Sequence, residues 1–178
     1  MRGPLQRLAD TPAMSAFATC DICDAHQADN GTTFRVLPPR WREFGGAASF
    51  SGAVSTVQCF EDNTLVRAAL ESPGAGRVLV IDGGGSMRTA LVGGKLGVLA
   101  LEQGWAGIVV DGCVRDAAEL AACAIGIRAL ALCPMPPAKR GAGQRDVPVR
   151  LQGVPVKPGD WLYADADGIV LLDRPLAA

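Results

Sequence analysis

The chain has 178 residues, enough for one domain with a sizeable core, and 49% of them are hydrophobic. Its 17 basic and 18 acidic residues give a net charge of −1, which excludes the clustered basic excess typical of nucleic-acid binding. The longest apolar runs are strand-sized and the amino-terminal segment has no apolar core. We therefore expect a cytoplasmic protein without a membrane span or a signal peptide.

The first part of the chain predicts few regular elements. Residues 1–18, with two prolines, are expected to be an irregular lead-in to a single domain that covers residues 1–178. Asp62 or Asn63 is placed to cap a helix. The elements expected here are a helix at 19–27, a loop at 31–44, a strand at 47–60 and a helix from 61–63 to about 71.

From residue 77 onward apolar strands alternate with helices, and short strands follow. Consecutive strand–helix–strand units predict parallel pairing with right-handed crossovers. The chain is therefore predicted to be α/β with a β-rich end, its strand layers stacked and its helices covering one side. The expected elements are strands at 77–82, 105–111 and 127–132, helices from 87 through 91, at 95–103 and at 116–124, a loop at 134–146, and short strands at 147–151, 154–156, 161–164 and 168–172.

Two glycine clusters are candidate anion sites. Gly83-Gly84-Gly85-Ser86 follows an apolar strand and matches neither a P-loop nor GxGxxG, so it is either an anion cradle or a tight strand-to-helix turn. Gly93-Gly94-Lys95-Leu96 interrupts a helical pattern, where each glycine costs about 1 kcal/mol relative to alanine. The interruption indicates either a new helix start, whose free amides attract a carboxylate or phosphate, or a packing kink.

The segment Asp111-Gly-Cys-Val-Arg115-Asp116 joins an apolar strand to a helix, the position where ligands bind in α/β sheets. Arg115 offers a planar fork for a carboxylate or an enolate oxygen. Asp116 offers a hard oxygen ligand for Mg²⁺ or Mn²⁺. The alternative is structural, with Asp116 as a helix cap in a capping box with Glu119.

Other nucleophiles and metal ligands carry weaker signals. Cys20, Cys23 and His26 form a CxxC followed by the only histidine, without the second pair that zinc sites usually need. A single histidine also argues against a Ser-His-Asp triad. Among the three lysines, Lys95, Lys139 and Lys157, nothing marks one as a Schiff-base nucleophile.

Seven segments in this order resemble the RraA-like family, which includes 4-hydroxy-4-methyl-2-oxoglutarate aldolases, oxaloacetate decarboxylases and the regulator of ribonuclease activity A. Together these motifs are highly specific for the family, though much less so for one member, and they cover roughly residues 19–172. The segments are FGGAASFSG at 44–52, CFEDN at 59–63, GRVLVIDGGGS at 76–86, GWAGIVVDG at 104–112, VRD at 114–116, YAD at 163–165 and DGI at 167–169.

The resemblance implies a swivelling β/β/α domain, a ring-shaped homotrimer and a site between subunits. It implies that Asp116 holds a divalent cation, partly through water, and that Arg115 contacts the 2-oxo oxygen. Backbone amides of Gly94, Lys95 and Leu96, after Gly93, would bind the pyruvyl carboxylate. Aldolase members often carry an acidic residue where this chain has Gly94, so Glu119 or a carboxylate of another subunit would have to substitute.

The resemblance thus implies a divalent-metal-dependent lyase. It would cleave 4-hydroxy-4-methyl-2-oxoglutarate to pyruvate, decarboxylate oxaloacetate, or do both through a pyruvate enolate. The alternative is a non-catalytic regulator that binds and inhibits ribonuclease E. A methyltransferase function, sometimes attributed to such chains, lacks support from any nucleotide-binding glycine fingerprint.

Overall fold

The computed structural model describes residues 17–29 and 31–177, so the predicted lead-in over 1–18 lies almost entirely outside the described residues. Within them, nine strands form one sheet in the order β1-β11-β10-β3-β4-β5-β6-β2, with β7 beside β3. A separate hairpin joins β8 to β9. The strands are β1 (Phe34–Val36), β2 (Arg42–Glu43), β3 (Phe50–Gln58), β4 (Val78–Val92), β5 (Gly107–Val114), β6 (Gly126–Leu132), β7 (Gln144–Arg145), β8 (Val149–Leu151), β9 (Val154–Val156), β10 (Trp161–Ala164) and β11 (Ile169–Leu172).

The sheet changes character along β3. Residues 50–53 of β3 pair antiparallel with β10, whereas residues 54–58 pair parallel with β4. The pairs β4–β5 and β5–β6 are also parallel, as the alternating strand and helix pattern predicted. Strand β3 therefore belongs to both halves of the sheet.

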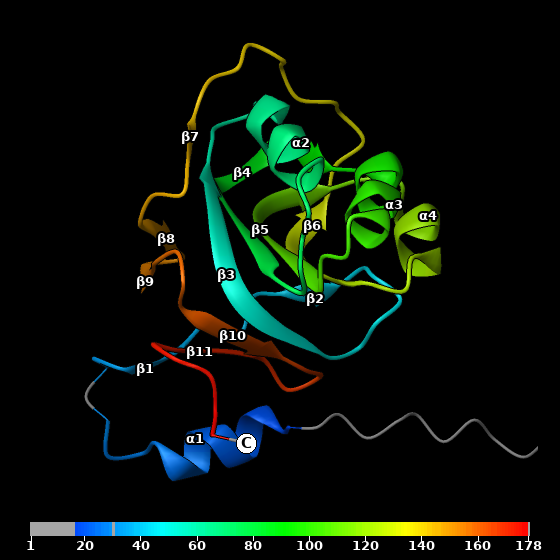
Figure 1. Ribbon diagram of the computed structural model, residues 1–178. Helices are drawn as coiled ribbons and strands as arrows, with labels where there is room; N and C mark the ends of the chain where they lie inside the picture. Colours follow the sequence, from blue (N-terminus) through cyan, green and yellow to red (C-terminus); the bar gives the residue numbers. More distant parts are fainter. Residues whose placement is uncertain (1–16, 30, 178) are drawn as a thin grey trace, which may run out of the picture.

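Helices α2, α3 and α4 cover one face of the parallel half (Figure 1). Their bounds are Thr64–Leu70, Gly94–Glu102 and Ala117–Ala122. Along β4, Leu79 and Ile81 belong to the core shared with these helices, while Val78 and Val80 belong to a second core with β8–β11. Because alternate side chains are buried on opposite faces, the whole run is apolar. The layering is that of the expected β/β/α fold.

Helix α1 (Thr19–Ala25) lies apart from the other helices, against the β10–β11 side (Figure 1). Its Ile22 packs in a small cluster with Tyr163 and Val170. Thr19 is tied to the β10–β11 turn, since its amide and hydroxyl both donate to the Asp165 carboxylate, at 2.7 and 2.6 Å. Among the described residues no helix is long and apolar enough to cross a membrane.

The predicted helix through residue 91 is wrong. Strand β4 continues to Val92, and between its partners Asp111 and Val114 on β5 the register shifts three times. Gly84 and Gly85 have φ of 64° and 68°, which lets the chain bulge out and then rejoin the sheet. Pairing of residues 90–92 with β5 therefore overrides the local helical pattern.

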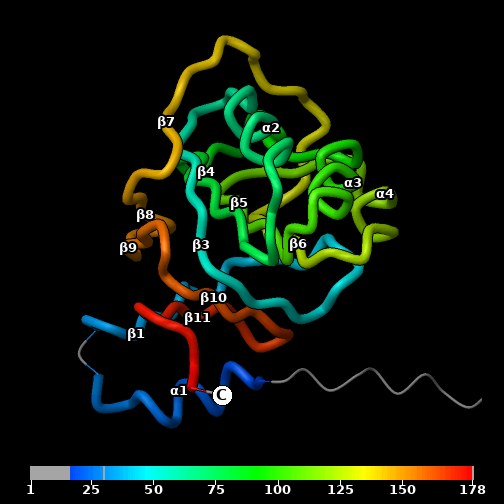
Figure 2. Tube along the Cα trace, viewed as in Figure 1, coloured from blue at the N-terminus to red at the C-terminus, as the bar shows by residue number. Residues whose placement is uncertain are grey.

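The long loop after β6 follows a path around α2 before it reaches β7, as Figure 2 shows. The Ala90 amide donates to the Met135 carbonyl at 2.9 Å, which fixes the beginning of the loop to β4. Asp62, just before α2, accepts from the amides of Arg140 and Ala142, at 2.5 and 3.5 Å. The loop is therefore held at two points along its path. The predicted span of 134–146 is wrong at its end, because residues 144 and 145 pair with β3 as β7.

Candidate active site

Arg115 and Asp116 connect the end of β5 to the start of α4, as predicted. Asp116 has φ 59° and ψ 49°, a left-handed conformation that aspartate and asparagine adopt more readily than most residues. This turn directs the carboxylate away from its own helix, toward the amino terminus of α3. The Gly94 amide donates to Asp116 Oδ2 at 3.0 Å.

The capping-box interpretation of Asp116 and Glu119 is wrong. Asp116 occupies the N-cap position of α4, but its side chain makes no cap hydrogen bond there. It serves instead as the acceptor at the start of α3, where the helix dipole favours a negative charge. Of the two structural alternatives for Gly93 and Gly94, the new helix start is confirmed, because α3 begins at Gly94.

Carboxylate side chains approach both glycines closely. A Cβ at Gly93 would lie 2.6 Å from Asp116 Oδ2. A Cβ at Gly94 would collide with Glu119 Oε2, and its distance to the Glu119 Cδ would be 2.7 Å. Glu119 therefore fills the space that a side chain at position 94 would need. The start of α3 thus lies against the carboxylates of Asp116 and Glu119.

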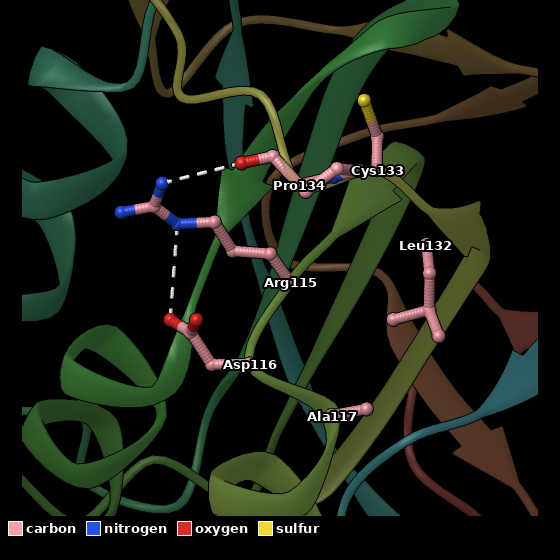
Figure 3. Close-up of a pocket in the computed structure, with 6 residues that line it drawn as sticks. All are labelled: Arg115, Asp116, Ala117, Leu132, Cys133 and Pro134. Atoms are coloured by element: carbon pink, nitrogen blue, oxygen red, sulfur yellow. Dashed lines mark hydrogen bonds and ion pairs between the residues drawn. The ribbon is translucent and has the colours of Figure 1, made fainter.

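Arg115 lies between the two chain segments that flank the site (Figure 3). Its Nε is 3.7 Å from Asp116 Oδ2, and its Nη1 donates to the Pro134 carbonyl at 3.5 Å. In Figure 3 its Nη2 points away from both partners. The side chain is 40% exposed, so its guanidinium keeps donors for a ligand.

Two hollows flank this pair. One, of about 270 Å³, is lined by Arg115, Asp116 and residues 117 and 132–134 (Figure 3). The other, of about 400 Å³, brings Arg115 and Asp116 together with three of the four residues predicted from the glycine cluster, Gly93, Lys95 and Leu96. The fourth residue, Gly94, is hydrogen-bonded through its amide to the Asp116 carboxylate. The structure thus gathers all six predicted site residues in one place.

The amides at the start of α3 are not equally available to a ligand. The Gly94 amide is used by Asp116, and the Leu96 amide donates to the Gly93 carbonyl at 3.0 Å. The Lys95 amide has no acceptor among the described residues. The predicted carboxylate site at these amides is therefore reduced to one open donor, supported by the helix dipole.

The wider hollow also contains two residues that the sequence did not indicate as binding residues, Arg67 of α2 and Lys139 of the long loop. Glu119, which the family resemblance offered as a substitute for an acidic residue at position 94, lines it as well. Lys139 drew attention only as a possible nucleophile, and Arg67 carried no signal, because their meeting depends on how the loop passes α2. The two adjacent glycines were a second signal for Glu119, since they indicate that another group approaches the backbone.

The other sequence candidates do not form comparable sites. Gly83–Ser86 lies within β4 and does not start a helix, so the interpretation as a strand-to-helix turn is wrong. His26 is bonded through Nδ1 to the Ile22 carbonyl at 2.8 Å and stacks on Phe34. No group of three or more His, Cys, Asp or Glu side chains that could hold a metal occurs among the described residues, including Cys20 and Cys23.

Asp111 lies within β5, three residues before the end of the strand, and is buried. It accepts from Gln152 Nε2 at 2.6 Å. Burial raises the pKa of its carboxyl, partly opposed by the two hydrogen bonds from Gln152. Asp111 therefore ties β5 to the turn between β8 and β9, where Gln152 lies.

Comparison with known proteins identifies close relatives over nearly the whole chain. The Aldolase/RraA family profile matches residues 19–171. A protein from Albidiferax ferrireducens, provisionally named 4-hydroxy-4-methyl-2-oxoglutarate aldolase, is 60% identical over 164 residues, covering 88% of this chain and 95% of the relative. A Burkholderia multivorans protein with the same provisional name is 60% identical over 156 residues, covering 87% and 95%.

Solved structures share the fold. The RNA-processing inhibitor RraA from Thermus thermophilis superimposes with a TM-score of 0.86 at 49% identity, covering 91% of this chain and 96% of that one. A Geobacillus kaustophilus protein described as an S-adenosylmethionine:2-dimethylmenaquinone methyltransferase gives a TM-score of 0.84 at 44% identity, covering 90% and 97%. The names of these relatives therefore span three different functions.

Proposed function

Since this chain belongs to the RraA-like (Aldolase/RraA) family, we propose that it is a lyase that cleaves 4-hydroxy-4-methyl-2-oxoglutarate to two pyruvates. The same site would decarboxylate oxaloacetate, because both reactions pass through a pyruvate enolate. The observation that carries the proposal is the placement of Arg115, Asp116 and Glu119 around the start of α3. The aldolase names of relatives about 60% identical support it.

Asp116 and Glu119 are suited to hold a divalent cation. They lie over consecutive glycines and line the same hollow. Mg²⁺ is commonly held by one or two carboxylates and keeps several waters, so this small donor set fits it or Mn²⁺. Such a cation supplies Lewis-acid polarisation of the substrate's 2-oxo group.

Arg115 and the start of α3 bind and orient the pyruvyl part of the substrate. The Lys95 amide donates to the carboxylate, and the guanidinium of Arg115 donates to the 2-oxo oxygen. During cleavage the C4 hydroxyl loses its proton and the C3–C4 bond breaks. Its electron pair passes to the enolate oxygen, where Arg115 stabilises the developing charge. Protonation at C3 then gives the second pyruvate.

Glu119 takes the place of the acidic side chain that is absent at position 94, where this chain has glycine. Its carboxylate occupies the position where a side chain at residue 94 would lie. There it would take up the C4 hydroxyl proton through a bound water and return a proton to C3 of the enolate by the same route. Glu119→Gln is expected to reduce turnover more than substrate affinity, because the amide fills the same space but no longer accepts a proton.

The test is pyruvate release from each of the two substrates, with and without Mg²⁺. Asp116→Asn keeps the left-handed backbone and the acceptor for Gly94, but the amide is a poorer ligand for a hard cation. We expect turnover to fall by orders of magnitude with the fold intact. Arg115→Lys keeps the charge and loses the fork, so turnover should fall as well. Near-normal turnover of both variants would defeat the proposal.

We also propose a homotrimer, with the site completed at a subunit interface. Exposed hydrophobic side chains near the site, Leu132 and Met135 at 45% and 58% exposure, are consistent with a covering subunit. Light scattering at micromolar concentration should give three times the chain mass. A stable monomer would contradict this.

The regulator function is the second candidate, supported by likeness to the Thermus RNA-processing inhibitor. Its mark would be binding to a ribonuclease E-type partner that survives Asp116→Asn. If the parent protein releases no pyruvate from either substrate and the partner binds, the regulator becomes the better assignment.

A further inference from the structure

The wider hollow beside Asp116 has two chemically different sides. Asp116 and Glu119 form the acidic side, next to the start of α3. Four cationic residues line the rest, namely Arg67, Lys95, Arg115 and Lys139. Four positive and two negative side chains leave a formal excess of two positive charges. A hollow of this kind favours a dianion over a monoanion.

Two of the cations are far from the proposed reacting centre in the sequence and are held there by separate elements. Arg67 lies in α2, one turn from its start. Lys139 lies between Ala138, whose amide donates to the Glu61 carbonyl at 2.8 Å, and Arg140, whose amide is bound by Asp62. Asp62 also accepts from the Thr64 amide at 2.9 Å. One buried carboxylate thus fixes Lys139 beside the helix that carries Arg67.

Neither cation is neutralised strongly by the protein. The Lys139 ammonium forms no ion pair among the described residues. Arg67 has Glu71 as its ion-pair partner at 3.6 Å, with the two side chains 52% and 55% exposed. Such an exposed pair contributes little, so Arg67 can exchange it for a ligand at small cost.

We infer that Arg67 and Lys139 bind the distal carboxylate of the substrate and make the enzyme selective for 2-oxo diacids over 2-oxo monoacids. The inference rests on the proposed function, which places the pyruvyl end at Arg115 and the Lys95 amide. The far end of a bound substrate then extends across the hollow toward α2 and the long loop. Pro136 and Pro137 line the same hollow and stiffen the loop that presents Lys139.

The first test uses a matched pair of substrates that both release pyruvate. 4-Hydroxy-4-methyl-2-oxoglutarate has a distal carboxylate where 4-hydroxy-4-methyl-2-oxopentanoate has a methyl group. For Arg67→Gln and for Lys139→Gln, kcat/KM on the diacid should fall about 10- to 100-fold, mostly through KM. On the monoacid it should change less than about twofold. Lys157→Gln, an exposed lysine in a distant turn, is the control and should alter neither value.

The second test does not depend on turnover. With Mg²⁺ present, calorimetry compares the binding of 2-oxoglutarate and 2-oxopentanoate, which differ in the same way. The parent should bind the diacid at least about tenfold more tightly, and each variant should remove most of the difference. Equal binding of the two acids by the parent, or an unchanged preference in both variants, would overturn the inference. If the parent released no pyruvate but still bound the diacid more tightly than the monoacid, only the lyase proposal would be refuted.

Discussion

Two glycine clusters, ten residues apart, look alike in the sequence and do different things in the structure. Gly84 and Gly85 have positive φ and let β4 bulge from the sheet. Gly93 has an extended backbone and Gly94 begins a helix, so neither needs positive φ. Asp116 and Glu119 instead occupy the space that a Cβ at these two positions would need. A glycine can therefore indicate a left-handed backbone in one place and the close approach of a neighbouring side chain in another.

The largest expected effect distinguishes the second kind of glycine. Gly94→Ala places a methyl group against the Glu119 carboxylate, and relieving the collision must move Glu119 or α3. We expect a loss of about 1 to 3 kcal/mol in the free energy of unfolding and at least a tenfold loss of pyruvate release. Denaturant unfolding and the pyruvate assay measure the two.

A double variant sharpens this result. In Gly94→Ala with Glu119→Gly the colliding atoms, which include the Glu119 Cβ, are absent. Stability should therefore return to that of Glu119→Gly, while activity should not. If Gly94→Ala alone leaves stability and turnover unchanged, the close approach has no energetic meaning and the comparison between the clusters fails.

A smaller effect is expected in the first cluster. Gly85 has φ 68°, and a Cβ there would meet Gln152 Nε2 at 3.4 Å, an ordinary contact. Gly85→Ala should therefore cost about 1 to 2 kcal/mol through left-handed strain alone. Gly85→Asn should cost less, because asparagine tolerates this conformation. Pyruvate release should be retained in both; equal losses of stability for alanine and asparagine would contradict a backbone origin.

The smallest effect appears only in acid and concerns Asp62, which holds the long loop beside α2. Burial alone would raise the pKa of Asp62, but hydrogen bonds led by those from the Thr64 and Arg140 amides lower it from 3.8 to about 2. Because the folded-state pKa is lowered, its contribution to stability is fully present above about pH 4 and is lost as the pH falls toward 2.

Asp62→Asn should remove that part of the acid sensitivity. Unfolding free energies measured between pH 5 and 2 should fall less steeply in the variant than in the parent. Identical slopes would mean that the Asp62 carboxylate does not hold the loop.

Much of the fold was accessible from the sequence because apolar strands and helices alternate between residues 77 and 132. The parallel pairing of β4, β5 and β6 was predicted from that alternation. The segment 87–91 failed because its helical pattern is local, whereas its pairing with β5 depends on a bulge that periodicity does not reveal.

The site was accessible for similar reasons and with similar limits. Arg115 and Asp116 lie next to each other and directly follow a strand, so their position was predictable. The link from Asp116 to Gly94 spans 22 positions and depends on the left-handed turn at residue 116. Arg67 and Lys139 line the same hollow because the long loop passes α2, and the amino-acid sequence alone does not reveal the path of that loop.

Strand β3 has a practical consequence, because it separates the ends of the described chain from the chemistry. Its first half pairs with β10, on the side where α1 and the segment after β11 lie, while α3 and α4 cover the parallel half (Figure 1). The Leu176 amide donates to the Tyr163 hydroxyl at 2.8 Å, which keeps the carboxyl-terminal segment on that side. A fluorophore or surface tether attached after residue 177 would therefore report on the protein without crowding the hollow at Asp116.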